Sequence, residues 1–342
     1  MYKKLAAISI FETKLKNLQI IPYNPTYKNQ WNEFVKKSAN GCFLHDRNFM
    51  DYHADRFEDH SLMFFDKEEL AACFPAHQSG STLHSHLGLS YGALLTLKQQ
   101  VEASSETRQI QSVNANIYPG LLQNLVNYSK DKNFEKLELK LPPPFFDPYF
   151  EKHYKNLFEW DFQTIEESLD LVVYLKEDWL PSPKKTIGYR NGKFDSLQIV
   201  VSEDLKEFWN ELLIPQLQKR HDAKPTHTLE EIELLQSRFP SQILQYYVEH
   251  EGHKIAGITL FDYGNILKVQ YAAANPTGFE RNAMDFLYLE IIQEAKDQGR
   301  EFVDLGTVNN RDGSINEGLL RFKKQLGAVV TPVVEIALNL RS

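Results

Sequence analysis

The sequence has few cysteines and lacks the motifs of several large enzyme classes. Its 342 residues include only two cysteines, Cys42 and Cys73, and no Cys-x-x-Cys pair. This usage excludes a disulfide framework and indicates a reduced, cytoplasmic protein. The chain also has no P-loop, no dinucleotide-binding glycine motif and no serine nucleophile elbow, so the enzyme classes that depend on those motifs are not indicated.

Positive charge and long apolar runs are also scarce. The chain has 38 Lys and Arg against 46 Asp and Glu, a formal net charge of −8. This balance argues against a broad nucleic-acid-binding face, which must neutralise phosphates. No apolar run approaches the roughly 20 residues that cross a bilayer, so we expect no membrane insertion. The segment before Leu18 lacks an Ala-x-Ala cleavage site and is interpreted as a disordered or misassigned leader.

The sequence does contain an internal repeat. The segments 129–140 and 295–306 each follow a helix-like stretch and end in an extended apolar run. Four of their twelve positions are identical, namely Lys130 and Lys296, Asp131 and Asp297, Glu135 and Glu301, and Leu139 and Leu305.

The residues before the second copy indicate an antiparallel meander followed by a helix and a strand. Apolar residues alternate with period two, and Gly and Asn interrupt the runs at turn positions. Thr277 and Glu280 have the spacing of a helix-starting capping box, and Gly299 stands where a helix ends. The expected strands are 242–249, 254–262, 266–274 and 301–306, with a helix over 278–298.

The first half shows the same order, so we predict an α+β protein made of two tandem domains, residues 18–165 and 166–342. Each domain is expected to be a mixed, mostly antiparallel sheet flanked by helices. The final strand, 331–340, completes the second domain or crosses back to the first. In the first half the expected strands are 61–66, 69–76, 83–91 and 135–141, and the helix is 118–130.

Four strings carry a resemblance to a known family: 40–53, 85–92, 269–274 and 316–328. With the duplicated order of elements, they resemble tandem acyltransferases of the GNAT superfamily, in its FemAB-like branch, over about residues 20–340. The last string is the most specific, because a strand ending in Asp-x-Gly is followed by a loop and a Gly-Leu-x-x-Phe-Lys helix. The resemblance implies a GNAT-like fold for each domain.

The resemblance further implies an N-acyltransferase. The donor would be acyl-CoA, such as acetyl-CoA, used as a co-substrate without a metal. The acceptor would be the amine of a sugar, a nucleotide sugar or a cell-envelope precursor. In this superfamily the third meander strand splays from its neighbour and holds the donor. We expect a monomer or a homodimer.

Two catalytic candidates follow from the resemblance. Phe322 and Lys323 match a Phe-Lys pair of FemX-type enzymes, in which the lysine stabilises the oxyanion of the tetrahedral intermediate. Tyr271 lies on the third meander strand, where the donor or the acceptor would dock, and is the expected contact in that groove. Gln270 points to the opposite face from Tyr271 by period two, so both can line one groove only if a bulge intervenes.

The expected CoA-binding loop, 275–283, departs from the superfamily pattern Arg/Gln-x-x-Gly-x-Gly/Ala. Gly278, Arg281 and Asn282 are the candidates for contacts with the donor. Glu280 falls in the first helical turn, where its charge opposes a pyrophosphate that the helix dipole would otherwise attract.

The acceptor candidates lie elsewhere. Arg220 and His221 end a predicted helix, where cations complement the dipole, and they could also bind an anionic substrate such as a nucleotide sugar. His45 and Arg47 lie just before a second helix-like segment. The group His77, His84 and His86 lacks a further ligand at metal-binding spacing, so we predict no metal site.

Two other functions remain open. A FemX-type aminoacyl-tRNA-dependent peptidyltransferase would place tRNA phosphates on the one basic cluster. A degenerate, non-catalytic GNAT-like protein would bind a partner instead, which the atypical CoA loop suggests. The basic cluster consists of Lys184, Lys185, Arg190 and Lys193.

Overall fold

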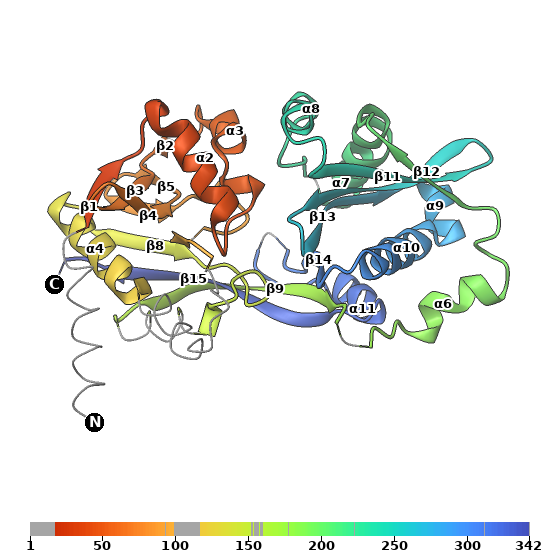
Figure 1. Ribbon diagram of the computed structural model, residues 1–342. Coiled ribbons are helices and arrows are strands. Elements are labelled where there is room, and N and C mark those ends of the chain that lie inside the picture. Colours follow the sequence, from red (N-terminus) through yellow and green to blue (C-terminus); the bar gives the residue numbers. More distant parts are fainter. Residues whose placement is uncertain are drawn as a thin grey trace, which may run out of the picture. The chain divides into compact units, whose positions relative to one another are not determined.

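The chain folds into two compact units. The described residues up to Glu167, with those from Val333 onward, form unit 1, and Ser168–Pro332 form unit 2 (Figure 1). The leader expected before Leu18 lies outside the described residues. The structure is a computed structural model, and it describes residues 18–92, 94–98, 117–151, 153, 157, 160–176, 178–221, 223–310 and 312–341.

Unit 2 is built on a mixed sheet with the strand order β10-β11-β12-β13-β14-β9. The predicted meander is present as β11, β12 and β13, each antiparallel to the next, whereas β13 and β14 run parallel. The strands are β9 (Gln163–Tyr174), β10 (Gln198–Ser202), β11 (Ile243–His250), β12 (His253–Asp262), β13 (Ile266–Ala274) and β14 (Phe302–Thr307).

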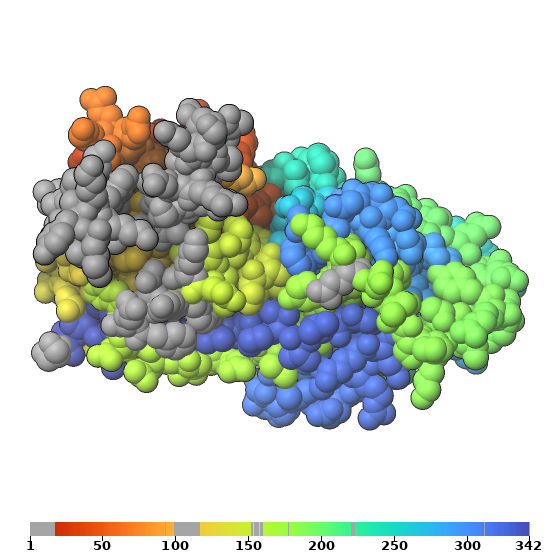
Figure 2. All heavy atoms as spheres, turned by 60° about the horizontal axis from the view of Figure 1, so that its bottom comes forward, coloured from red at the N-terminus to blue at the C-terminus, as the bar shows by residue number. Residues whose placement is uncertain are grey.

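Helices cover both faces of this sheet. The long helix α10 packs on one face, while the π-helix η6, α7 and α8 lie on the other (Figure 1). Helix α6 lies at the surface, where Ile187 and Tyr189 are exposed (Figure 2). The helices are α6 (Pro183–Arg190), η6 (Phe208–Leu213), α7 (Ile214–His221), α8 (Leu229–Arg238), α9 (Pro276–Arg281), α10 (Ala283–Asp297) and α11 (Glu317–Gln325).

The single helix predicted over 278–298 is two helices, which corrects that expectation. The chain turns at Asn282, whose left-handed backbone (φ 56°, ψ 36°) separates α9 from α10. The predicted Thr277 capping box is also wrong. Instead Asn275 caps α9, since its Oδ1 accepts a hydrogen bond from the Gly278 amide at 2.9 Å, and Pro276 occupies the first helical position.

Unit 1 contains two sheets, in the orders β1-β3-β4-β7 and β15-β8-β6-β5-β2. Helix α4 (Ile117–Asp131) belongs to this unit, as do α2 (Lys28–Lys37), α3 (Arg47–Met50) and the short 3₁₀ turns η1 (Pro25–Tyr27), η2 (Phe43–His45) and η3 (Asp51–His53). The strands are β1 (Gln19–Pro22), β2 (Glu58–Asp59), β3 (Leu62–Asp66), β4 (Glu69–Phe74), β5 (Ala76–Ser79), β6 (Thr82–Ser85), β7 (Leu95–Thr96), β8 (Lys136–Lys140) and β15 (Val329–Asn339).

The first half therefore does not form a single meander as predicted. The expected strand 69–76 divides at Pro75, which cannot donate to a ladder, and its two parts enter different sheets. The expected strand 83–91 ends at Ser85, where the chain leaves the sheet in a turn. The predicted α+β class, with mixed sheets flanked by helices, is confirmed.

The sequence repeat corresponds to one helix–strand unit present twice. Helices α4 and α10 both span 15 residues, and their first and last residues are separated by the same number of positions as the two copies of the repeat. Each leads into a strand that runs parallel to an earlier strand of the same unit, β8 beside β6 and β14 beside β13. Of the two paths left open for the final strand, the structure has the one that returns to unit 1, where Glu335–Asn339 of β15 pair with β8.

Each unit has its own apolar core. In unit 2, residues of α10 such as Leu287 and Ile292 pack on Ile258 and Val303 of the sheet. In unit 1, Leu121 and Leu125 of α4 pack around Leu137. In the part of the chain that is described, no helix combines the length and apolarity needed to cross a membrane.

Three buried histidines and one partly buried histidine lie close together in unit 1. The rings of His77 and His84 stack at 4.9 Å, those of His53 and His86 at 4.9 Å, and His77 and His86 lie 5.4 Å apart. Burial and the neighbouring imidazoles lower the pKa of His77 to about 4 and that of His86 to about 2. Among the described residues, no group of three or more His, Cys, Asp or Glu side chains has a metal-binding arrangement.

We expect acid to destabilise unit 1. The folded form binds fewer protons than the unfolded chain below the unfolded histidine pKa, so this stability is complete above about pH 6.5 and falls as the pH drops toward the folded pKa of His77. At pH 5 the loss is at most about 2 kcal/mol for one such imidazole, because solvent screens part of the effect. Calorimetric melting at pH 7.5 and pH 5 measures it. His77→Phe should reduce the difference, whereas substitution of the exposed His253 by Asn should leave it unchanged.

Candidate functional site

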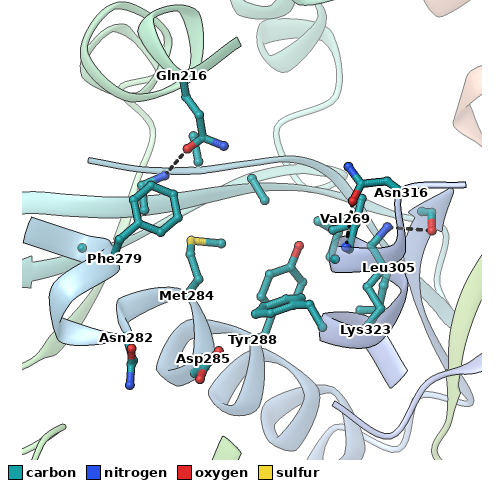
Figure 3. A pocket seen from close by; sticks show the side chains of 18 of the residues that line it. Gln216, Val269, Phe279, Asn282, Met284, Asp285, Tyr288, Leu305, Asn316 and Lys323 are labelled. Carbon is teal, nitrogen blue, oxygen red and sulfur yellow. Dashed lines mark hydrogen bonds between the residues drawn. The ribbon is translucent and has the colours of Figure 1, made fainter. Parts of the chain in front are cut away.

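The candidate site of unit 2 lies where two parallel strands part. Strands β13 and β14 pair only over Ile266–Lys268 and Phe302–Asp304. Beyond these residues they diverge, and a cavity of about 940 Å³ lies in the gap (Figure 3). Side chains of α7, α9, α10 and α11 complete its walls. The short pairing is therefore what opens the site.

A β-bulge at Gln270 decides which side chains of β13 face the cavity. Thr259 of β12 pairs with Tyr271 and Leu260 pairs with Val269, so Gln270 is the extra residue. Val269 and Gln270 line the cavity.

Tyr271 is directed elsewhere and is not among the residues that line the cavity. Its hydroxyl lies 2.6 Å from His227 Nδ1 and accepts a hydrogen bond from the His227 amide at 3.2 Å. Its ring packs edge-on against Trp209, with the centroids 5.1 Å apart. Tyr271 thus holds the segment before α8 against the sheet, and its role as a groove contact stays a prediction.

Lys323 reaches the cavity from α11 and holds the end of β14. Its Nζ donates to the carbonyls of Gly306 at 2.8 Å and Thr307 at 2.9 Å, and its side chain is only 4% exposed. Gly306 has a left-handed φ of 81°, a conformation that glycine adopts without strain. An ammonium has three N–H donors, so one remains after these two bonds.

Three further charges lie buried beside Lys323. Lys268 Nζ is 2.5 Å from Asp304 and 4.0 Å from Asp170. Burial and the nearby Asp304 raise the pKa of Asp170 to about 7. Burial lowers the pKa of Lys323 to about 8, against the opposing attraction of Asp170 and Asp304. Burial also acts to lower the pKa of Lys268, but its two carboxylate neighbours raise it more. The pKa of Lys323 is therefore close to neutral pH, and this lysine lies at the edge of the cavity.

The α10 wall carries two polar side chains that the sequence did not single out, Tyr288 and Asp285. Tyr288 is 4% exposed, and its hydroxyl points away from α10 into the cavity (Figure 3). Lys185 of α6 pairs with Asp285 at 2.6 Å, and its Nζ lies 3.9 Å from the centre of the Phe322 ring. A signal for Tyr288 did exist, because the equivalent position in the first copy of the repeated helix is the apolar Leu122.

The predicted donor-binding residues are only partly brought together. Gly278 and Asn282 line the cavity, whereas Arg281 is an exposed side chain at the end of α9 and does not line it. The Gly278 amide is already bound by Asn275. The backbone of the loop therefore comes close to the cavity at Gly278, but the amide of this residue is not available to bind a phosphate.

The predicted acceptor-binding residues lie outside this cavity. Arg220 and His221 end α7, but their side chains are not described, so their role stays a prediction. His45 is 1% exposed, and its Nδ1 accepts a hydrogen bond from the Cys42 amide at 3.1 Å. Arg47 is 2% exposed, pairs with Asp59 at 2.8 Å and stacks on two aromatic rings. Both side chains serve the interior of unit 1, and a binding role for them also stays a prediction.

The equivalent gap in unit 1 is closed. Strands β6 and β8 also pair over only three residues, Thr82–His84 with Lys136–Glu138. Beyond them, the Lys140 amide donates to Ser85 Oγ at 2.7 Å, and the Gly92 amide donates to the Lys140 carbonyl at 2.9 Å. These bonds hold the two segments together where β13 and β14 separate.

Comparisons with known proteins agree with this geometry. Residues 185–324 match the family described as an acetyltransferase (GNAT) domain, a range that includes Lys185 and Lys323. At the level of sequence, no curated protein matches the chain.

Solved structures with the same fold cover nearly the whole chain. FemX is 11% identical over 94% of this chain and 97% of that chain, with a TM-score of 0.63. L-PGS from Bacillus licheniformis is 14% identical over 92% and 91%, with a TM-score of 0.56. The C-terminal domain of a putative lysylphosphatidylglycerol synthetase from Agrobacterium fabrum is 14% identical over 93% of each chain, with a TM-score of 0.57. The predicted FemAB-like fold of the GNAT superfamily is confirmed.

We expect Gly278→Ala to damage the cavity wall. A Cβ there would lie 2.2 Å from the Ile255 carbonyl oxygen, so backbone must shift. The free energy of unfolding should fall by roughly 1–3 kcal/mol, as in overpacked cores. Denaturant unfolding measures it. Gly318→Ala is the matched control, because its Cβ would meet its nearest atom, Asn316 Oδ1, at 3.5 Å. An unchanged stability of Gly278→Ala would contradict this account of the wall.

Proposed function

We propose that this chain is an N-acyltransferase that moves an acyl group from acyl-CoA to the amine of a sugar, a nucleotide sugar or a cell-envelope precursor. The observation that carries the proposal is the gap between β13 and β14, with a buried lysine, Lys323, at its edge. The GNAT-type fold supports a transferase.

The parted strands provide a seat for an extended, amide-bearing donor. A strand without a neighbour exposes backbone donors and acceptors along its edge, and an extended ligand can pair with them. Strand β13 has such an edge from Val269 to Ala274. At the end of this edge the Ala274 amide already donates a hydrogen bond to Gln216 Oε1 at 2.9 Å. The small side chains of three successive alanines, Ala272 to Ala274, leave room for a ligand beside this strand. The pantetheine arm of acyl-CoA has the chemistry to occupy it.

Lys323 would stabilise the oxyanion. When the acceptor amine attacks, the new C–N bond places negative charge on the carbonyl oxygen, and a fixed donor there lowers the barrier. Lys323 has one N–H left for that oxygen, and its two bonds to carbonyls fix its position. The C–S bond then breaks, the new amide nitrogen loses one proton, and the leaving thiolate gains one, so that the products are the amide and free CoA. Because the pKa of Lys323 is about 8, the ammonium is the main form at pH 7.

The region expected to bind the phosphates of CoA favours a second candidate function, the FemX-type transfer from aminoacyl-tRNA. Asn275 already binds the Gly278 amide, and the exposed Glu280 adds negative charge to α9. The exposed Lys184 and Arg190 on α6 are available for nucleic-acid phosphates, and the chain shares its fold with FemX over 94% of its length. A non-catalytic, partner-binding role is the third candidate.

The first test is the melting temperature with and without acetyl-CoA. A ligand at about 100 times its Kd stabilises the folded protein by about 2.7 kcal/mol, which should raise the melting temperature by a few degrees. CoA lacking its acyl group and a charged tRNA serve as comparisons. A shift with charged tRNA alone that falls steeply with salt would favour the second candidate. The absence of any shift would favour the third.

Replacement of Lys323 tests the chemistry. Lys323→Ala should lower kcat by roughly 10²–10³, the usual effect of losing one oxyanion donor, with little change in donor KM. Initial rates against a series of amine acceptors measure this. The neighbouring exposed Lys324→Ala should retain full activity.

The pH profile gives an independent readout. If the ammonium of Lys323 is the active form, kcat falls as the pH rises through about 8, because the group then loses its proton. Lys323→Arg should remove that decline, since a guanidinium stays charged. Full turnover by Lys323→Ala would contradict the assignment.

A further inference from the structure

The α10 wall contains a hydroxyl without a partner. Tyr288 is buried, yet the structure shows no hydrogen bond from its Oη to any described residue. Figure 3 shows the hydroxyl pointing away from α10 into the cavity. The hydroxyl therefore faces any ligand that fills the cavity, and a polar atom covered by a ligand is normally paired.

Apolar side chains and a lysine paired with a carboxylate share this wall with Tyr288. Val269, Met284, Leu305 and Phe322 also line the cavity, and the Phe322 ring meets the Tyr288 ring edge-on at 5.4 Å. Phe322 also packs under Lys185 Nζ, whose charge is neutralised by Asp285. This wall therefore presents no excess charge, and it suits a neutral hydrogen-bonding group better than an ammonium or a carboxylate.

We infer that Tyr288 selects donors whose acyl group carries a neutral hydrogen-bonding substituent, such as a hydroxyl, over plain acyl donors. This inference rests on the proposed function, because it places the acyl group where the strands part. A plain acyl chain would cover the hydroxyl without pairing it, which costs free energy. An acyl hydroxyl would pair with it. Burial raises the pKa of Tyr288, so the phenol stays neutral and can both donate and accept.

The test compares the binding of two CoA thioesters, 3-hydroxybutyryl-CoA and butyryl-CoA, to the full chain by calorimetry. The wild-type protein should bind the hydroxyacyl compound roughly three- to tenfold more tightly, the effect of one hydrogen bond. Tyr288→Phe should remove this preference. Tyr246→Phe is the matched control, because its hydroxyl bonds Glu294 at 3.2 Å and does not line the cavity. It should keep the preference.

Equal binding of the two thioesters by the wild-type protein, or a preference that survives Tyr288→Phe, would overturn the inference alone. Binding of neither thioester would overturn the acyl-CoA function. In that case 3′-O-lactyl adenosine and 3′-O-propionyl adenosine carry the same comparison for a nucleotide-ester donor. Tighter binding of the lactyl ester, lost in Tyr288→Phe, would support the inference, and equal binding of the two esters would overturn it.

Discussion

A buried ion pair determines where the site opens. Lys268 and Asp304 face each other in the last paired register of β13 and β14, and their side chains meet at 2.5 Å. A lysine and a carboxylate so deeply buried are tolerated because each compensates the other. The next residues of the two strands, Val269 and Leu305, already line the cavity. The pair therefore marks the end of the ladder and the beginning of the site.

The rest of the site is arranged around this point. Asp304 also accepts a hydrogen bond from the Gly306 amide at 2.7 Å, and the Gly306 carbonyl in turn holds Lys323. Asp170 lies on β9, the other neighbour of β14, and its carboxyl comes within 4.0 Å of Lys268 Nζ. Lys323 is thus positioned by contacts that follow from one strand end, and the same charges act on its pKa.

The duplication gives two versions of one helix–strand unit with opposite outcomes. In unit 1, Ser85 and Gly92 bond to Lys140, and the gap between the parallel strands is filled by the chain itself. In unit 2, the bulge at Gln270 and the alanines after it leave the gap open. The two units of a duplicated fold can differ in this way, because a few local hydrogen bonds decide whether the edge of a strand is open to a ligand.

The repeat, the meander of unit 2, the order of its helix and strand and the candidate Lys323 could all be predicted from the sequence, because periodicity and motif spacing are local properties. Three outcomes could not be predicted in this way: β4 and β5 join different sheets, the last strand returns to unit 1, and Tyr271 turns from the cavity while Tyr288 enters it. The physical reason is that these outcomes depend on pairings between distant residues. Lys268 and Asp304 are 36 positions apart, and one bulged residue reverses the facing of a side chain.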